Sequence, residues 1–153
     1  NLNGSIAQNL CYAALNRIGK GINIDRKIER KMIEKQVSDL QIKVADTSYP
    51  ISVLSGGNQQ KVAVGNWLNI DPEVMIFDEP SKGIDVNAKQ QIFQIIWDQS
   101  RKGVSSILVS TELEELLETC HRILIMRNGK ITKEVDPKQM TVEDLYAVCM
   151  GEE

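Results

Sequence analysis

The sequence has no long apolar run and few cysteines, and each absence excludes a class of protein. No stretch approaches the roughly eighteen consecutive apolar residues that a membrane-spanning helix needs, so we expect a chain that neither spans a membrane nor is exported. The three cysteines, Cys11, Cys120 and Cys149, are far apart and odd in number. This pattern favours buried thiols in a reducing compartment over a disulfide framework or a metal site. The formal net charge of −3 gives no general attraction to nucleic acid, so we expect no such partner.

The composition is that of a globular protein: 42% of the 153 residues are hydrophobic and 25% are charged. The first third reads as helical. A capping box at Ser5 and Gln8 predicts a helix to about Ile18. A single apolar stripe on charged residues 25–44 predicts a second helix, and its members are Ile33, Val37, Leu40 and Val44.

Strands and helices alternate in the second half of the chain. Short apolar runs predict strands over residues 74–78, 105–110 and 122–127 that are buried on both faces. Residues 129–135 predict a peripheral strand after a turn at Asn128 and Gly129. The alternation indicates an α/β fold with a parallel sheet and crossover helices.

Helix boundaries in this half are marked by residues that cap helices. One helix is predicted from Gly57 to about Asn69, and another over residues 86–102 between Asp85 as N-cap and Gly103 as C-cap. Two further helix starts are marked by capping boxes, at Thr111 with Glu114 and at Thr141 with Asp144.

Two adjacent carboxylates, Asp78 and Glu79, stand at the end of the strand over residues 74–78. The carboxyl ends of strands in open α/β sheets are where ligands bind. In phosphoryl transfer, a strand-end aspartate helps to hold Mg²⁺ and a neighbouring group orients or deprotonates the attacking water. Asp78 suits the first role and Glu79 the second. The alternative is a strand that simply ends in a solvated acidic turn before Pro80.

Ser55, Gly56 and Gly57, called the signature residues below, directly precede a predicted helix. Glycines there allow an anion to approach bare backbone N–H groups, and the helix N-terminus adds about half a positive charge. Ser55 adds a hydroxyl donor. The alternative is an ordinary loop-to-helix junction with a serine cap.

In combination, "LSGGNQQKV" (54–62), "VMIFDEP" (74–80) and "SKGID" (81–85) resemble the signature motif, Walker B motif and D-loop of ATP-binding-cassette (ABC) ATPases. "ILVSTELEEL" and "HRILIMRNGKI" resemble the switch region and the last strands of that fold. Asn58, the "QQK" after it and "KGIDV" most resemble the second cassette of tandem ATP-binding proteins of ribose-type monosaccharide importers.

The resemblance implies a fold and a set of roles. The fold is part of a P-loop NTPase (ABC ATPase) core with a parallel sheet, with a helical subdomain over residues 1–56 and the C-terminal part of the core over residues 57–153. The signature residues would contact the γ-phosphate of an ATP bound by a partner cassette. Asp78 would assist Mg²⁺, and Glu79 would be the catalytic base. Asp85 would lie in the D-loop across the dimer interface. Gln60 and Lys61 match the motif without a catalytic role.

The resemblance also implies partners and a place in the cell. The partners would be a second ABC cassette in the same chain or a dimer mate, transmembrane permease subunits and, indirectly, a periplasmic or extracellular sugar-binding protein. The protein would be peripheral, at the cytoplasmic face of the membrane.

Two departures from the family pattern bear on activity. At the switch position the family carries a histidine, and here Thr111 stands there, where we expect it to cap a helix; His121 is expected to be incidental. No P-loop motif G-x-x-x-x-G-K-[ST] is present, since Lys20 is followed by Gly21 and Lys130 by Ile131. We therefore interpret the chain as a fragment of a cassette, lacking the Walker A motif, glutamine loop and first strands, and expect the fragment alone not to hydrolyse ATP.

Two alternatives remain open besides the sugar-importer ATPase. One is a nucleoside importer cassette, although there the acidic pair is usually degraded and here it is intact. The other is a catalytically silent cassette that lends its signature motif to a partner. An intact P-loop upstream would favour an enzyme, and a degenerate one the silent module.

Overall fold

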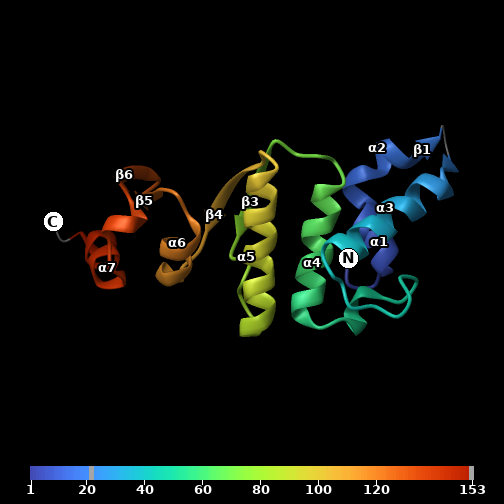
Figure 1. The fold of residues 1–153 in the computed structure, drawn as a ribbon, viewed down its shortest axis with the longest axis horizontal. Coiled ribbons are helices and arrows are strands. Elements are labelled where there is room, and N and C mark those ends of the chain that lie inside the picture. Colours follow the sequence, from blue (N-terminus) through green and yellow to red (C-terminus); the bar gives the residue numbers. More distant parts are fainter. Residues whose placement is uncertain (21–22, 152–153) are drawn as a thin grey trace. The chain divides into compact units, whose positions relative to one another are not determined.

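A computed structural model describes residues 1–20 and 23–151, and the chain forms two compact units. The first unit comprises residues 1–75 and 81–105, and the second comprises residues 76–80 together with the chain from residue 106 onward. Figure 1 shows the elements of both units. The subdomain division expected at residue 56 stays a prediction. Within the described residues, none of the helices has the length and apolar character needed to cross a membrane.

The first unit is mainly helical. Its helices are α1 (Ile6–Cys11), α2 (Leu15–Ile18), α3 (Arg26–Asp39), α4 (Gly56–Leu68) and α5 (Val86–Arg101), with the 3₁₀ helices η1 (Tyr12–Ala14) and η2 (Ile51–Val53). Two short strands, β1 (Gly19–Lys20) and β2 (Asn23–Ile24), pair antiparallel. The predicted capping box of α1 is confirmed, with Gln8 N–H donating to Ser5 Oγ at 3.1 Å. The single helix expected to Ile18 is divided into α1, η1 and α2.

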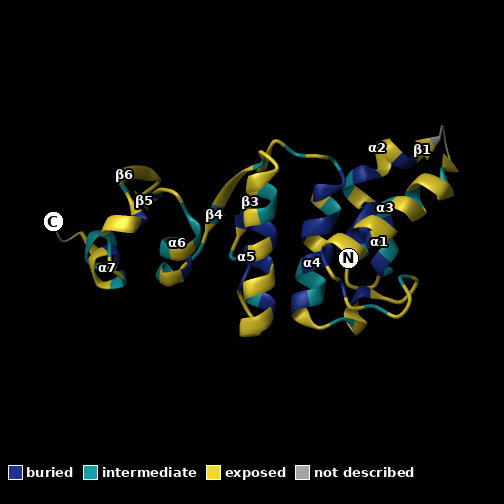
Figure 2. Cartoon of the chain, in the orientation of Figure 1, coloured by how far each residue is buried: buried dark blue, intermediate teal, exposed yellow. Residues whose placement is uncertain are grey.

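The core of the first unit forms where α1 packs against α3 and α4, and Figure 2 shows buried residues on these helices. Close approach depends on Gly65, because a Cβ there would lie 2.9 Å from Leu40 Cδ1 and 3.0 Å from Leu10 Cδ2. A buried polar chain adds specificity: Gln36 Nε2 donates to Asn69 Oδ1 at 2.9 Å, and Asn69 Nδ2 donates to the Leu10 carbonyl at 2.8 Å. The buried side chains of Gln36 and Asn69 are thus paired with each other, as stability requires.

Helix α3 ends earlier than the apolar stripe predicted. It stops at Asp39, and Val44 lies outside it. Gln41 adopts a left-handed backbone with φ 50°, and the N–H of Ile42 donates back to the Val37 carbonyl at 2.9 Å. This is a Schellman end, which satisfies the last carbonyls of the helix. The expected extension to Val44 is therefore wrong.

Strands β3 (Val74–Asp78) and β4 (Ser105–Val109) form a parallel pair. Hydrogen bonds at both ends fix the direction: Ser105 N–H to the Glu73 carbonyl and Glu79 N–H to the Val109 carbonyl, each at 2.9 Å. The predicted parallel pairing of these strands is confirmed. Their burial on both faces is not, because Ile76 is 68% exposed and Ile107 is 52% exposed. In β3 only Met75 and Phe77 are buried, and none of the residues of β4 is.

The remaining elements of the second unit are α6 (Leu113–Thr119), β5 (Ile123–Arg127), β6 (Lys130–Val135), η3 (Pro137–Gln139) and α7 (Val142–Met150). Strand β5 pairs antiparallel with β6, and in the described part of the chain it joins neither β3 nor β4. The expected third parallel strand is thus a hairpin strand. Its turn is as predicted, with Asn128 and Gly129 at φ 50° and 75°, as a two-residue hairpin loop needs.

Apolar side chains of β5, α6 and α7 form the small core of this unit around Ile123, Ile125 and Leu145. Cys120 and Cys149 pack against it, while Cys11 is buried in the first unit; none of the three is in a disulfide. Burial, followed by the charge of Glu29, raises the pKa of Cys11 to about 11. Cys11 is therefore a buried thiol, as the sequence predicts, while Cys120 and Cys149 are only half-buried.

Candidate functional site

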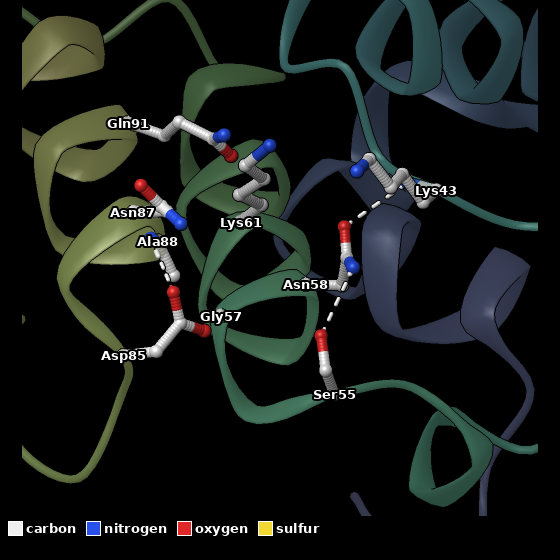
Figure 3. A pocket seen from close by; sticks show the side chains of 9 residues that line it. All are labelled: Lys43, Ser55, Gly57, Asn58, Lys61, Asp85, Asn87, Ala88 and Gln91. Atoms are coloured by element: carbon white, nitrogen blue, oxygen red, sulfur yellow. Dashed lines mark hydrogen bonds between the residues drawn. The ribbon is translucent and has the colours of Figure 1, made fainter.

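The signature residues begin α4, and Ser55 occupies the N-cap position with an extended backbone. Its side chain makes no capping hydrogen bond. Instead, Ser55 Oγ accepts from Asn58 Nδ2 at 3.0 Å, and Asn58 Oδ1 accepts from the Lys43 backbone N–H at 3.0 Å (Figure 3). The serine cap considered as the alternative is therefore absent. The first backbone N–H groups of α4 are not engaged by this side chain, which suits an anion-binding helix start.

The two signature glycines have different surroundings. Gly56 is exposed, and a Cβ there would meet Ile84 Cγ2 at 3.5 Å, an ordinary contact. Gly57 is buried, and a Cβ there would lie 2.3 Å from Ala88 Cβ in the first turn of α5. Helices α4 and α5 lie side by side at this point (Figure 1).

A hollow of about 240 Å³ lies beside the signature residues, between the first turns of α4 and α5 (Figure 3). It is lined by Lys43, Ser55, Gly57, Asn58, Lys61, Asp85, Asn87, Ala88 and Gln91. Asp85 caps α5 as predicted, since its Oδ1 accepts from the Ala88 N–H at 2.9 Å. The structure thus brings the D-loop aspartate and the signature motif to one hollow.

Lys61 is the buried cation of this hollow, 3% exposed. Its Nζ donates to the Gln41 carbonyl at 3.1 Å. Burial, followed by the nearby charge of Lys43, lowers the pKa of Lys61. The left-handed turn at Gln41 that ends α3 therefore also supplies the acceptor for the signature lysine.

Asp78 and Glu79 belong to the second unit, at the carboxyl end of β3. Asp78 is exposed. One or two carboxylates together with substrate phosphates and water are the usual ligands of Mg²⁺, so a single carboxylate here fits that ion when phosphate is bound. Glu79 has a left-handed backbone, φ 47°, which is uncommon for a residue with a side chain.

The carboxylate of Glu79 is held by Thr111. The Thr111 backbone N–H donates to Glu79 Oε1 at 3.0 Å, and Thr111 Oγ1 donates to Oε2 at 3.4 Å. The predicted capping box of Thr111 and Glu114 is wrong: α6 begins at Leu113, its N-cap is Glu112, and no side chain caps it. In a capping box the Glu114 carboxylate would accept from the Thr111 backbone N–H, and that N–H is already bonded to Glu79.

Sequence reasoning missed two residues that contact the signature turn, by which we mean residues 55–58 at the start of α4. The backbone N–H of Lys43 donates to Asn58, and the methyl group of Ala88 lies against Gly57. The sequence offers one indication for Ala88: it stands three residues after the N-cap Asp85, in the first turn of a predicted helix, on the face that a neighbouring helix would cover. His121 is exposed and precedes β5.

Comparison with known proteins places this geometry in a family. The family model described as "ABC transporter" matches residues 3–82. The ribose import ATP-binding protein RbsA 2 of Agrobacterium fabrum is 40% identical over 149 residues, covering 97% of this chain and 29% of that protein. The ribose import ATP-binding protein RbsA of Caldanaerobacter subterraneus subsp. tengcongensis is 39% identical over 150 residues, covering 97% and 30%. The chain thus spans less than a third of these curated relatives.

Solved structures agree on the fold. The structure of cbiO1 from Clostridium perfringens, part of the ABC transporter complex cbiONQ, aligns with a TM-score of 0.72 at 22% identity, covering 90% of this chain and 53% of that one. The ADP conformation of MJ1267, an ATP-binding cassette of an ABC transporter, gives 0.73 at 22% identity, covering 97% and 60%. The α/β fold expected from the sequence, part of an ABC ATPase core, is confirmed, and the chain belongs to the ABC transporter family.

Proposed function

We propose that this chain is part of the ATP-hydrolysing, nucleotide-binding subunit that powers import of a monosaccharide across a membrane. The observation that carries the proposal is the alignment of nearly the whole chain, 96–97%, with proteins named for ribose import and ATP binding, at up to 40% identity. The signature motif, acidic pair and D-loop lie within that aligned length, and the acidic pair is intact.

The proposed signature role is to close on the ATP of a partner cassette. It is supported by the helix start at Ser55, whose hydroxyl does not cap α4, and by the lysines that border the hollow. Asp85 from the D-loop lines the same hollow and would face the same partner. Residues 1–56 would form the signature subdomain, and residues 57–153 the C-terminal part of the core.

The proposed catalytic role belongs to Asp78 and Glu79. When ATP and Mg²⁺ are bound, they supply the phosphoryl group and the charge neutralisation for hydrolysis. Asp78 would help to hold Mg²⁺, and Glu79 would orient the attacking water and take its proton. Thr111 holds the Glu79 carboxylate in one orientation, which supports its use as a fixed base.

The proposed partners are a second cassette, transmembrane permease subunits and, through them, a sugar-binding protein outside the cell. The protein would be peripheral at the cytoplasmic face of the membrane. The nucleoside importer cassette and the silent cassette remain the alternatives. The second is favoured by one specific observation, which is the threonine at the switch position.

The test is Ser55→Arg in the complete ATP-binding protein, with lysine variants of each P-loop isolating one ATP site at a time. Bulk and charge at Ser55 should impair closure and single-turnover hydrolysis at the partner site while nucleotide affinity at its own cassette is kept. Ser52→Arg, the same change at an exposed serine of η2, is the matched control. Loss confined to the variant's own cassette would show that the signature does not act in trans.

A further inference from the structure

We propose that Ala88 is a positioning residue: its methyl group seats against Gly57 and holds the D-loop end of α5 on the signature turn of α4. The proposal deepens the proposed function and rests on it for its catalytic readout. Under it, Gly57 is glycine because α5 occupies the space of a side chain, and not only because a phosphate must approach.

The contact leaves no room for adjustment. A Cβ at Gly57 would lie 2.3 Å from Ala88 Cβ, far inside any real carbon contact, and the next atom is Ala88 Cα at 3.6 Å. Ala88 is 8% exposed, and its methyl group has no rotamer by which it could move away. A side chain at residue 57 must therefore push α5 off α4.

The same alanine is tied to the D-loop aspartate. Asp85 Oδ1 accepts from the Ala88 N–H at 2.9 Å, so Asp85, Ala88 and Gly57 form one connected series from the D-loop to the signature turn (Figure 3). The two elements that would face the partner's ATP are thus fixed to each other within the first unit. A shift of either must carry the other.

Gly56 provides the internal contrast. A Cβ at Gly56 would meet Ile84 Cγ2 at 3.5 Å and the Gly83 carbonyl at 3.7 Å, both ordinary contacts. Alanine at Gly56 therefore fits without displacing α5, whereas alanine at Gly57 does not. The effect of residue 88 should be specific to the second glycine.

The experiment is a double-mutant cycle of Gly57→Ala and Ala88→Gly. In thermal unfolding of the full chain, Gly57→Ala should lower Tm, on the order of 5 °C, as overpacking does. In the Ala88→Gly background, which itself has a lower Tm because glycine destabilises a helix, Gly57→Ala should cost much less, because the nearest atom to the new Cβ is then at 3.6 Å. Gly56→Ala combined with Ala88→Gly should be additive. If the Tm changes of Gly57→Ala and Ala88→Gly are also additive, the proposed steric contact between the two residues is wrong.

The catalytic readout uses the complete protein at equal amounts of folded enzyme. Gly57→Ala should reduce kcat at the partner site by about 10- to 100-fold, as misplacement of a catalytic element does, without changing KM at its own P-loop. Ala88→Gly should restore kcat. A small Tm effect of Gly57→Ala in the Ala88→Gly background without restored kcat would overturn the positioning role and leave phosphate approach as the reason for Gly57. If Ser55→Arg does not affect the partner site, the proposed trans role of the signature is contradicted. The Tm measurements of the double-mutant cycle are independent of that result and still test the contact between Gly57 and Ala88.

Discussion

Glu79 holds a strained backbone that three hydrogen bonds offset. A side chain at φ 47° costs about 1–2 kcal/mol. Its own N–H donates to the Val109 carbonyl at 2.9 Å, and Thr111 supplies two donors to its carboxylate. The left-handed backbone at Glu79 lets its carboxylate reach Thr111, which lies just after β4. Such local strain is characteristic of functional positions.

Replacement of Glu79 by glutamine should separate binding from turnover. Glutamine keeps an acceptor for the Thr111 N–H and a donor for its hydroxyl, so the local structure should persist, but an amide cannot take a proton from water. We expect single-turnover hydrolysis at this site of the complete protein to slow by about 10²- to 10⁴-fold with nucleotide affinity retained. Glu114→Gln, at an exposed residue of α6, serves as control. Unchanged hydrolysis would identify a silent site.

Replacement of Thr111 by valine should have a much smaller effect. The hydroxyl contact is long, 3.4 Å, while the backbone N–H, at 3.0 Å, is kept by any residue other than proline. Loss of one exposed hydrogen bond is worth about 1 kcal/mol or less, which corresponds to a rate change under about fivefold. The measurement is single-turnover hydrolysis beside Thr111→Ser. A loss in the valine variant as large as that of Glu79→Gln would mean that the hydroxyl, not the backbone, holds the glutamate.

Helix α7 offers a pH-dependent cap. The Thr141 hydroxyl and backbone N–H bond to Asp144, and the backbone hydrogen bond, followed by the side-chain one, lowers the pKa of Asp144 below 3.8. A lowered folded pKa means stability that is present above the unfolded value and lost as pH falls through the folded one. We expect the carboxylate part of the α7 cap to weaken as pH falls from the ordinary aspartate range through the lowered pKa of folded Asp144.

Two measurements check this: an NMR titration of Asp144 and the fall of Tm between about pH 5 and 2. Asp144→Asn should reduce Tm at neutral pH and make its fall in acid shallower than in the unchanged chain. Asp39→Asn is the control: this exposed aspartate at the end of α3 pairs with Lys35 on the surface, and such pairs contribute little stability. An ordinary Asp144 titration, with identical slopes in all three proteins, would contradict the prediction.

Helix starts were predictable where the capping partners are close in sequence, and less so where a distant residue intervenes. Ser5, Asp85 and Thr141 cap the helices that the sequence predicts, because cap chemistry is local. Thr111 does not, since its backbone N–H, which a capping box would direct to Glu114, donates instead to Glu79 just after β3. The end of α3 was missed because a left-handed Gln41 has no sequence signal comparable to glycine.

Tertiary partners were the least predictable. Apolar runs identified β5, but periodicity says nothing about which strand it joins, and it pairs with β6. The signature and acidic groups were found from their motifs, whereas the contact of Gly57 with Ala88 needed the helix packing. A motif can be recognised from residues that are neighbours in sequence, whereas helix packing depends on segments that are distant in sequence.

The chain as a whole should self-associate. Apolar side chains of β3 and β4 are open to solvent, with Ile76 68%, Ile107 52% and Val109 49% exposed. Exposed apolar strands favour pairing with another copy. Sedimentation velocity over a wide concentration range should show association that Ile76→Glu reduces and that Val86→Glu, at an exposed residue of α5, leaves in place. A strictly monomeric chain at all concentrations would count against this.

The division of the chain into two units also affects the order in which its parts can fold during translation. Residues 76–80 belong to the second unit, yet they leave the ribosome between the two segments of the first. The carboxylate of Glu79 can therefore form its hydrogen bonds only after Thr111, thirty-two positions later, has been synthesised. During translation α1, α3 and α4 can pack while β3 is still unpaired, and unpaired strands are the aggregation-prone part of a nascent polypeptide. Strand β3, at whose end the acidic pair lies, is thus the segment of the nascent chain that would benefit most from binding by a chaperone.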